Sequence, residues 1–370
     1  MTEFLQKLLN GQKVEWKKLG EVTQYEQPTK YLVKTQDYND SFATPVLTAG
    51  KTFILGYTDE VDGIYEGSHN PVIIFDDFTT ANKWVDFDFK AKSSAMKMIT
   101  SSDDGQCILK YVYYWLNTLP NELMDGDHKR QWISNFCNKS IPLPTLPVQK
   151  EIVRILDTLT THTAELKAEL KAELTARKKQ YAYYRDKLLT FGDGVEWKKL
   201  GEVCEVQRGR RLTKKELSDE YQFPVFHGGL EPLGRYLKSN RKSDTIMIIN
   251  VGASAGTIGY SAVDFWSSDG CYCLEHSSII NNKFLYYLLI GKQNFLMSKV
   301  RKAGIPTLDA FIIEKLQIPI PTLPVQKEIV AILDKFDTLT NSITKGLPKE
   351  IELRTKQYEY YRNELLNFKK

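Results

Sequence analysis

The sequence predicts an α+β protein made of two tandem units, each a variable globular body followed by a long helix. Residues 141–157 read IPLPTLPVQKEIVRILD and residues 318–334 read IPIPTLPVQKEIVAILD, so fifteen of seventeen positions are identical. VEWKKLGEV occurs twice as well, at 14–22 and 195–203. Gln-Tyr-x-Tyr-Tyr-Arg occurs at 180–185 and again at 357–362. The copies lie 177 or 181 residues apart, so the whole chain is an internal duplication.

Bulk composition is that of an ordinary soluble protein with room for two or three domains in 370 residues. The net charge of +4 is mildly basic, which permits a nucleic-acid partner without requiring one. No apolar run approaches the ~18 residues that a membrane span needs, and the N-terminus lacks a signal-peptide pattern. Five sparse cysteines, an odd number, indicate reduced thiols, so we expect a cytoplasmic protein.

Each body opens with Trp-Lys-Lys-Leu-Gly-Glu-Val and continues with short β-rich segments separated by Gly, Asn and Asp. A helix follows in each body, at 107–119 and at 283–300. Because the strands come in runs, we expect mixed or antiparallel sheets. The predicted strands are 45–47, 53–57, 72–75 and 84–87 in the first body and 224–227, 235–237, 246–249 and 257–261 in the second.

Three prolines precede each long helix and make a stiff extended connector. Apolar residues then recur at three- and four-residue steps, and the first helix is predicted over 147–191, or ~67 Å at 1.5 Å per residue. Such a helix is not stable alone, so we expect the two copies to pack lengthwise as a coiled-coil-like rod. The predicted packing residues are Ile152, Ile155, Leu159, Leu166, Leu170, Leu174, Ile329, Ile332, Phe336, Ile343, Leu347 and Ile351.

The short link Gly192–Gly194 returns the chain directly into the second body, which favours antiparallel helices and a pseudo-twofold arrangement. Residues 164–175 repeat Ala-Glu-Leu every four residues, so one repeat more or less changes the helix by ~6 Å. In the second copy Gly346-Leu347-Pro348 should break the helix. We interpret the tyrosines at 181–184 and 358–361 as packing residues rather than base-stacking platforms.

The motif Pro-x-Pro-x-x-x-x-Gln-x-x-Ile-x-x-x-Leu-Asp, twice after a variable body and twice before a long helix, resembles the specificity subunit of type I restriction-modification systems. The Ala-Glu-Leu repeat and the segment FDDFTT at 75–80 also resemble that family. The resemblance covers essentially the whole chain. It implies target-recognition domains at 1–143 and 192–320, a central repeated helical region at 144–191 and a C-terminal one at 321–370.

The resemblance further implies a DNA-binding subunit with no active site of its own, which reads a bipartite duplex target with one half-site per recognition domain. It implies two adenine-N6 methyltransferase subunits as partners and, in the full complex, two ATP-driven restriction subunits. S-adenosylmethionine, ATP and Mg²⁺ are then expected on those partners, and no cofactor or metal on this chain.

Candidate DNA contacts are basic side chains. From 207 to 242 there are nine Arg or Lys against four acids, a plausible phosphate-contacting face. The charge of the first body has the wrong sign for DNA, because residues 37–88 contain ten acids and two lysines. Its contacts would come from further along the chain, where Lys90 is a further possibility. The candidates are Lys83, Lys92, Lys97, Lys129, Arg130, Arg208, Arg210, Arg211, Lys214, Arg235, Lys238, Arg241 and Lys242.

The sequence shows no catalytic motif. Asn70-Pro71-Val72 lacks the second proline and the aromatic residue that a methyltransferase of this type needs, and the Gly-rich stretch 252–259 lacks a phosphate-loop ending. We interpret that stretch as a turn or a close-packed strand, with backbone approach to a DNA phosphate as the alternative. We interpret Asp76-Asp77 as a solvated or capping pair, and Cys271 and Cys273 as buried thiols rather than zinc ligands. The alternative to a DNA-specificity subunit is a two-headed protein scaffold without DNA specificity. A stand-alone nuclease or methyltransferase would need an active site that the sequence does not show.

Overall fold

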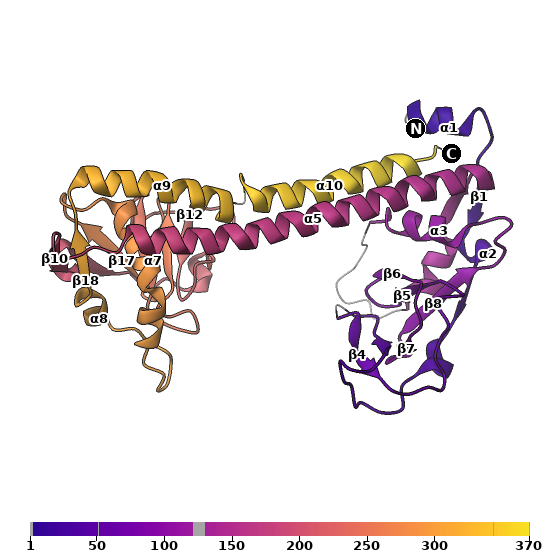
Figure 1. Cartoon of the computed structure of the whole chain (residues 1–370), viewed down its shortest axis with the longest axis horizontal. Helices are drawn as coiled ribbons and strands as arrows, with labels where there is room; N and C mark the ends of the chain where they lie inside the picture. The colour runs from indigo at the N-terminus through magenta and orange to yellow at the C-terminus, as the bar shows by residue number, and fades with distance from the viewer. Residues whose placement is uncertain (1–2, 51, 121–129, 343, 370) are drawn as a thin grey trace. The chain divides into compact units, whose positions relative to one another are not determined.

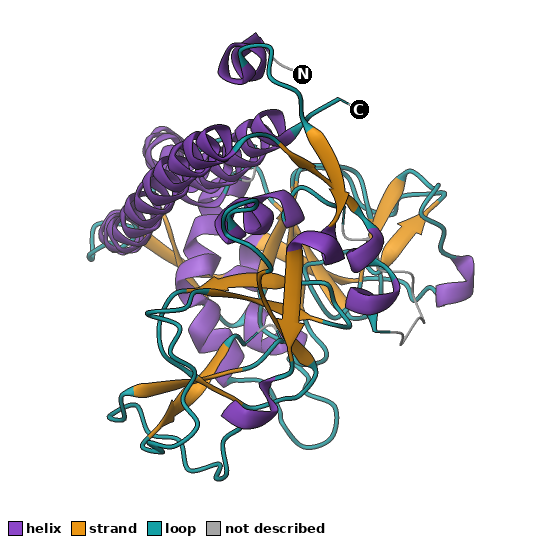
Figure 2. Cartoon of the chain, turned by 90° about the vertical axis from the view of Figure 1, so that its right-hand side faces the viewer, coloured by secondary structure: helices purple, strands orange, loops and turns teal. Residues whose placement is uncertain are grey.

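The computed structural model describes residues 3–50, 52–120, 130–342 and 344–369. The chain divides into two compact units, residues 1–169 with 351–370 (unit 1) and residues 170–350 (unit 2). From β1 and from β10 onward, most elements recur in the same order in both units, as the duplicated sequence predicts. Figure 1 and Figure 2 show the helices and strands of the chain.

The strands of unit 1 are β1 (Glu15–Lys18), β2 (Thr23–Glu26), β3 (Thr44–Leu47), β4 (Ile54–Thr58), β5 (Val72–Asp76), β6 (Asn82–Val85), β7 (Lys90–Ala91), β8 (Met96–Ser101) and β9 (Ser140–Leu143). Its short helices are α1 (Glu3–Leu9), α2 (Leu19–Val22), α3 (Leu109–Leu116) and α4 (Gln131–Ser134), with 3-10 turns η1 (Pro28–Tyr31) and η2 (Phe136–Asn138).

The strands of unit 2 are β10 (Glu196–Lys199), β11 (Cys204–Arg208), β12 (Phe223–Phe226), β13 (Gly234–Tyr236), β14 (Thr245–Ile249), β15 (Ile258–Ser261), β16 (Trp266–Ser267), β17 (Cys271–His276) and β18 (Gln317–Ile320). Its short helices are α6 (Leu200–Val203), α7 (Asn282–Ser298) and α8 (Ala310–Glu314), with the 3-10 turn η3 (Lys214–Glu216). All eight predicted strands overlap observed ones, and both predicted body helices are confirmed as α3 and α7.

Each unit stacks helices, a four-stranded sheet and a three-stranded sheet. The four-stranded sheets have the orders β2-β8-β5-β6 and β11-β17-β14-β15, and the three-stranded sheets β4-β3-β7 and β13-β12-β16. Strand β5 is buried along its whole length because its two faces serve two cores. Ile73 and Phe75 belong to the core beneath the helices, whereas Val72 and Ile74 belong to the core shared with the three-stranded sheet.

The two repeated sequence blocks pair with each other in space. In unit 1, β1 from VEWKK pairs antiparallel with β9 from SIPL, with Trp16 opposite Pro142. In unit 2, β10 pairs with β18 in the same register, with Trp197 opposite Pro319. Proline is tolerated there because a two-stranded ribbon leaves an edge on which no N–H is needed. The proline segment is therefore extended, as predicted, and it closes each body as a strand.

Three helices continue from these closures. Helix α5 (Leu146–Leu188) is uninterrupted and ends three residues before the predicted limit, whereas the second copy is divided into α9 (Leu323–Asn341) and α10 (Leu347–Leu366). The predicted break is confirmed at Gly346, whose φ of +83° favours glycine. A Cβ there would also lie 2.5 Å from the Thr338 carbonyl oxygen.

Antiparallel pairing is found in each unit. In unit 1 the Thr160 hydroxyl donates to the Tyr358 hydroxyl at 3.0 Å, while Leu365 near the end of α10 shares a core with Val148 near the start of α5. In unit 2 the Tyr184 ring stacks on Phe336 with centroids 5.6 Å apart. The interpretation of Tyr184 as a packing residue is confirmed.

The predicted packing residues of the long helices are confirmed in part. Ile152 and Ile329 are buried, but they belong to the cores of their own bodies rather than to a helix pair alone. Ile332 is 41% exposed, so its assignment was wrong, and Ile343 lies outside the described residues. Leu347 is buried, and half-buried positions make up the remainder: Ile155, Leu159, Leu166, Leu170, Leu174, Phe336 and Ile351. In the described part of the chain, none of the helices is long and apolar enough to cross a membrane.

A glutamine joins each long helix to its body. The fully buried Gln149 side chain accepts from the Ile108 N–H at 2.9 Å and donates to the carbonyl oxygens of Gln106 and Pro144, each at 2.9 Å. Its counterpart Gln326 accepts from the Asn281 N–H at 2.6 Å. We call this arrangement the glutamine joint.

In unit 2 the Gln326 amide completes the same joint by donating to the carbonyl oxygens of Ile279 at 3.1 Å and Pro321 at 2.8 Å. About two turns further along each helix, an aspartate makes a second tie. Asp157 accepts from the Tyr114 hydroxyl at 2.5 Å, and Asp334 accepts from the Tyr287 hydroxyl. The identical positions of the repeated motif are therefore those that attach the helix.

Replacing Gln149 by leucine should lower the free energy of unfolding of unit 1 by about 2–4 kcal/mol, because a buried N–H and buried carbonyl oxygens lose their partners. The loss can be measured by denaturant unfolding of the full chain. Gln357→Leu on the exposed face of α10 is the matched control and should change stability by less than about 0.5 kcal/mol. Equal losses for both variants would contradict the joint.

Candidate nucleic-acid interface

In unit 2, loops meet at one edge of the four-stranded sheet. Ile249, the last residue of β14, lies opposite Cys271, the first residue of β17, and Arg208, the last residue of β11, lies opposite Tyr272. The loops that leave or enter these strands must therefore lie together. We call them the loop edge of unit 2, which comprises residues 208–211, 227–229, 250–256, 267–270 and 301–307.

The first basic loop of this edge, residues 208–211, is hydrogen-bonded to strand β16. Arg210 donates its N–H to the Ser267 carbonyl oxygen at 2.9 Å, and the Trp266 indole donates to the Arg210 carbonyl oxygen at 2.7 Å. A Cβ on Gly209 would lie 2.1 Å from the Ser268 carbonyl oxygen, so only glycine allows this approach. Arg208, Arg210 and Arg211 are consequently displayed from a fixed loop, and all three are exposed.

A second basic segment, residues 238–242, lies beside the first. Asn240 forms a two-way hydrogen bond with the backbone of Ser267, at 2.7 and 3.0 Å. The Arg241 guanidinium donates to the carbonyl oxygens of Asn240 at 2.9 Å and Arg208 at 3.4 Å. The structure therefore brings together two basic clusters that lie about thirty residues apart in the sequence.

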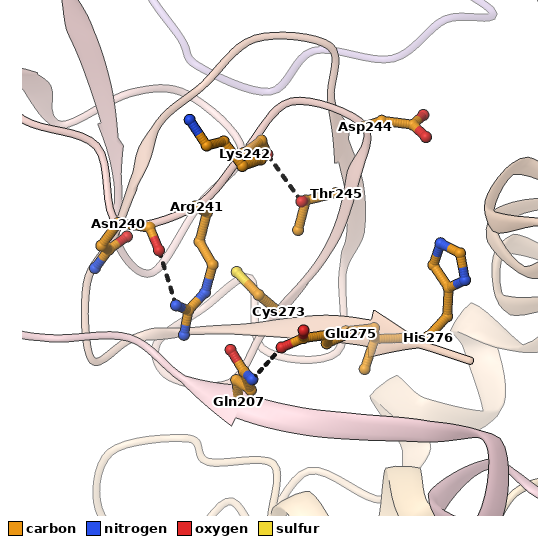
Figure 3. A pocket seen from close by; sticks show the side chains of 10 residues that line it. Gln207, Asn240, Arg241, Lys242, Asp244, Thr245, Cys273, Glu275 and His276 are labelled. Atoms are coloured by element: carbon orange, nitrogen blue, oxygen red, sulfur yellow. Dashed lines mark hydrogen bonds between the residues drawn. The ribbon is translucent and has the colours of Figure 1, made fainter. Parts of the chain in front are cut away.

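A polar cavity of about 310 Å³ lies between the Arg241 segment and the strand pair β11–β17, and both contribute to its lining. Figure 3 shows the Arg241 guanidinium pointing from its loop toward that strand pair, where Gln207 and Cys273 lie. The Nε of Arg241 is buried without a hydrogen-bond partner in the described part of the chain. The cavity is lined by Gln207, Asn240, Arg241, Lys242, Asp244, Thr245, Cys273, Leu274, Glu275 and His276.

The thiols behind this cavity are buried, as the sequence predicts. Cys271 and Cys273 lie on the face of β17 that packs against Phe226 and Phe265. A hydrogen bond from the Cys271 thiol lowers the pKa of Cys273 below its usual value, and the Arg241 charge acts in the same direction. Among the described residues, no group of three or more His, Cys, Asp and Glu side chains is placed to hold a metal ion.

The other candidate DNA contacts of unit 2 differ in whether their charged groups already have partners within the protein. The Arg235 guanidinium donates to the carbonyl oxygens of Tyr221 and Gln222, which fixes its position. Lys242 lies 3.2 Å from the Asp264 carboxylate. Lys214 and Lys238 are exposed. The Gly-rich stretch 252–259 contains the turn from β14 to β15, and its Gly256 packs against Met297 of α7.

In unit 1, two lysines with predicted or possible DNA contacts are instead structural. Lys97 is 1% exposed, lies 3.7 Å from the Asp77 carboxylate and faces the Tyr25 ring at 4.8 Å. Lys90 is equally buried and forms a 2.8 Å ion pair with Glu60. Both ammonium groups point inward, so neither is displayed on the surface that a duplex would meet.

These pairs account for part of the acidic character of the first body. Hydrogen bonding from Lys90 lowers the pKa of Glu60 to about 2, and the N–H groups of Thr35 and Lys34 act in the same direction. Asp76 accepts from the backbone N–H of Phe78 at 2.9 Å, which is the predicted capping role. Its neighbour Asp77 is buried and accepts from the Trp132 N–H at 2.8 Å, so it is not solvated. Several acids are thus part of the folded interior or its turns.

The remaining candidates of unit 1 surround the equivalent end of its sheet. Lys83 is exposed on β6, directly after the turn that follows β5, and Arg130 is exposed where the chain enters α4. Lys92 is half-buried after β7. Phe78, at the tip of the turn, is 42% exposed. Lys129 lies outside the described residues.

Sequence reasoning missed one basic loop of unit 2. The segment 276–308 contains five Lys or Arg and no Asp or Glu, a signal that was available from the sequence. The loop 301–307 lies at its end and belongs to the loop edge defined above.

A duplicated fold in which exposed arginines are displayed from fixed loops beside a polar cavity is typical of a protein that reads nucleic acid. The model of the type I restriction modification DNA specificity domain matches this chain twice, at residues 12–176 and 192–353. The chain belongs to that family and is a specificity subunit of a type I restriction-modification system.

Curated relatives agree over nearly the full length. The chain is 49% identical over 398 residues to the EcoR124I/EcoR124II specificity subunit of Escherichia coli, covering 99% of this chain and 97% of the relative. It is 32% identical over 402 residues to a putative type I specificity subunit of Haemophilus influenzae, covering 99% and 98%.

Solved structures show the same fold. A chain from a study of complex assembly and conformational transition in the type I system aligns with a TM-score of 0.65 at 18% identity, covering 96% of this chain and 98% of that chain. The specificity subunit of Mycoplasma genitalium aligns with a TM-score of 0.55 at 19% identity, covering 98% of both chains. The predicted α+β fold with long helices is confirmed.

The Glu60–Lys90 pair should make unit 1 sensitive to acid. Because the pKa of Glu60 is lowered in the folded state, its contribution to stability is present above about pH 4.5 and is lost as the pH falls toward 2. Glu60→Gln should reduce the free energy of unfolding at pH 7 by about 3 kcal/mol, since Lys90 remains buried.

Denaturant unfolding from pH 7 to pH 3 measures this effect. The difference between wild type and Glu60→Gln should shrink as the pH falls. Glu3→Gln, at an exposed ion pair with Lys7, is the control and should leave the curve unchanged. A difference that stays constant with pH would show that the pair does not titrate in this way.

Proposed function

We propose that each unit of this specificity subunit reads one half of a bipartite DNA target through its loop edge, and that the chain has no catalytic activity of its own. It would direct adenine-N6 methylation by two bound methyltransferase subunits, and restriction by ATP-driven subunits in the full complex. S-adenosylmethionine, ATP and Mg²⁺ would bind to those partners.

One observation carries this proposal: the two copies share their fold and their glutamine joints, while the loops at the end of each sheet differ in length, charge and chemistry. Identical joints are what two copies of one partner and one helical frame require. Different loops are what two different half-sites require. A scaffold without DNA specificity would not need a fixed, exposed arginine loop such as 208–211.

The arginine loop supports contact with the phosphate backbone. Arg208, Arg210 and Arg211 are exposed, and no salt bridge of the described residues engages them. In the described part of the chain, no carboxylate forms an ion pair with the nearby Arg241 guanidinium, which donates to the carbonyl oxygens of Asn240 and Arg208. Arginine at the polar cavity also has the donor geometry that reads guanine in the major groove.

Substituting Arg210 and Arg211 by alanine should weaken binding of the assembled methyltransferase complex to a duplex and reduce the slope of log K against log salt by about 0.9 for each lost phosphate contact. The measurement is a fluorescence titration at several salt concentrations. Lys178→Ala with Lys179→Ala on exposed α5 is the charge-matched control, and its slope should equal that of wild type. A slope equally unchanged in the arginine variant would remove this loop from the interface.

Helix α5 is proposed as the ruler of the spacer between half-sites, because it is uninterrupted between the two units and contains a four-residue repeat. Deleting Ala168–Lys171 shortens a continuous helix by ~6 Å. The methylated sites of cells that carry this deletion should keep both half-site sequences and have a shorter spacer.

Methylome sequencing with and without the deletion is the measurement. Substituting Ala168 by serine keeps the helix length and should leave the spacer as it is. An unchanged spacer after the deletion would show that α5 does not set it.

A further inference from the structure

We propose that Ile305 of unit 2 acts as an apolar wedge that enters the base stack of the second half-site, with Arg301 and Lys302 on the flanking phosphates. The inference rests on the proposed function and deepens it, because it assigns to one residue a way of reading DNA that needs no hydrogen bond to a base edge.

The first support is exposure. Ile305 is 71% exposed, the second-highest value among the large apolar side chains of the described residues. It stands between Gly304, whose φ is +78°, and Pro306. A Cβ built on Gly304 meets nothing within 4 Å, so the tip projects into open space. An isoleucine held away from every core gains nothing for the fold.

The second support is rigidity. Arg301 and Thr307 exchange backbone hydrogen bonds of 2.9 and 3.1 Å, which closes the loop at its base. The Thr307 hydroxyl donates to the Ile305 carbonyl oxygen at 2.9 Å, and the Pro306 carbonyl oxygen accepts from the Gly252 N–H at 2.9 Å. The tip is therefore tied to its own base and to the neighbouring loop, which keeps the entropic cost of inserting its side chain low.

The third support is charge. The 33 residues from 276 to 308 contain five basic side chains and no acidic one. Arg301 and Lys302 are both exposed beside the isoleucine. Exposed apolar surface next to two exposed cations is complementary to a polyanion. This charge favours DNA over an ordinary protein partner as the occupant.

The fourth support is position. Val251 forms an isolated β-bridge with Thr307, and its neighbour Asn250 donates to the Gly270 carbonyl oxygen at 3.2 Å. Asp269, adjacent to Gly270, accepts from the Arg208 guanidinium at 3.3 Å through its carbonyl oxygen. The Ile305 loop is thus continuous with the arginine loop along one edge of unit 2.

Apolar side chains that enter a base step unstack it and kink the duplex, at a cost that depends on the sequence being deformed. Pyrimidine–purine steps deform at the lowest cost. Ile305 would therefore favour half-sites with a flexible step at the point of insertion, while arginines on the same edge contact phosphates and bases.

The test uses the full chain assembled with its methyltransferase subunits. The probe is a duplex that carries the methylated target mapped in cells, with 2-aminopurine placed in turn at each position of the second half-site. Unstacking of one step by wild type should raise the fluorescence of one position. Ile305→Ala and Ile305→Ser should abolish that rise and weaken binding about tenfold, comparable to one mismatched base pair.

Controls separate the possible causes. Val263→Ala changes another exposed apolar residue of unit 2, 55% exposed, and should retain both signals. Lys302→Ala should retain the fluorescence rise and lower the salt slope by about 0.9. Gel filtration with the methyltransferase subunits reports whether Ile305→Ala still assembles.

Three outcomes would overturn the wedge. Ile305→Ala could keep both the fluorescence rise and the affinity, which would show that the side chain stays outside the stack. It could lose assembly with the methyltransferase instead, which would make the loop a protein contact. Wild type could bind every duplex equally, and that result would remove the proposed function itself, which the first two outcomes leave intact.

Discussion

The rest of the structure depends on one buried amide in each unit. Gln149 and Gln326 use both the donor and the acceptor of their side-chain amides, and every partner is a main-chain atom. Main-chain N–H and carbonyl groups are the same whichever residues carry them. The residue that donates its N–H to the joint is Ile108 in unit 1 and Asn281 in unit 2. A body can therefore change its sequence beside the joint without changing how the helix attaches. This explains how the joints stay identical while the bodies diverge.

Satisfaction of buried polar groups makes that joint specific as well as stable. A buried amide with any partner missing costs as much as several apolar contacts contribute, so shifted attachments are disfavoured. The aspartate–tyrosine tie further along each helix adds a second fixed point, because Asp157 and Asp334 hold the hydroxyls of Tyr114 and Tyr287. Two fixed points on each helix define its direction relative to its own body, which a protein that presents reading surfaces requires.

The elements that repeat or follow a strong period could be predicted from the sequence. The long helix, its broken copy at Gly346, eight of the strands and the body helices were all found. Strands β8 and β17 were not, although they lie inside the four-stranded sheets. The ribbons β1–β9 and β10–β18 were not found either, because VEWKK and the proline segment have no β pattern of their own and become strands only by pairing with each other. Lys90 and Lys97 could not be placed either, since their partners Glu60 and Asp77 lie 30 and 20 residues away. Charge counting along the chain does not distinguish a buried ion pair from an exposed face.

That limit bears directly on how the two units differ. Counted by sequence, the first body is too acidic for DNA, but three of its acids have partners within the fold. Glu60 pairs with buried Lys90, and Asp76 accepts from the Phe78 N–H. Asp77 lies beside buried Lys97 and accepts from the Trp132 N–H. The charge that a duplex would meet is what remains after those interactions. In unit 2 no carboxylate among the described residues forms an ion pair with the arginines at 208–211, so sequence and surface charge agree there. Among the described residues, unit 1 therefore offers fewer exposed cations with which to hold a phosphate backbone. The exposed Phe78 at its sheet end is large enough to contribute apolar contact. It follows that unit 1 would hold its half-site with fewer charge contacts to phosphates and more apolar contact than unit 2. Binding of the first half-site should therefore depend less on salt concentration than binding of the second.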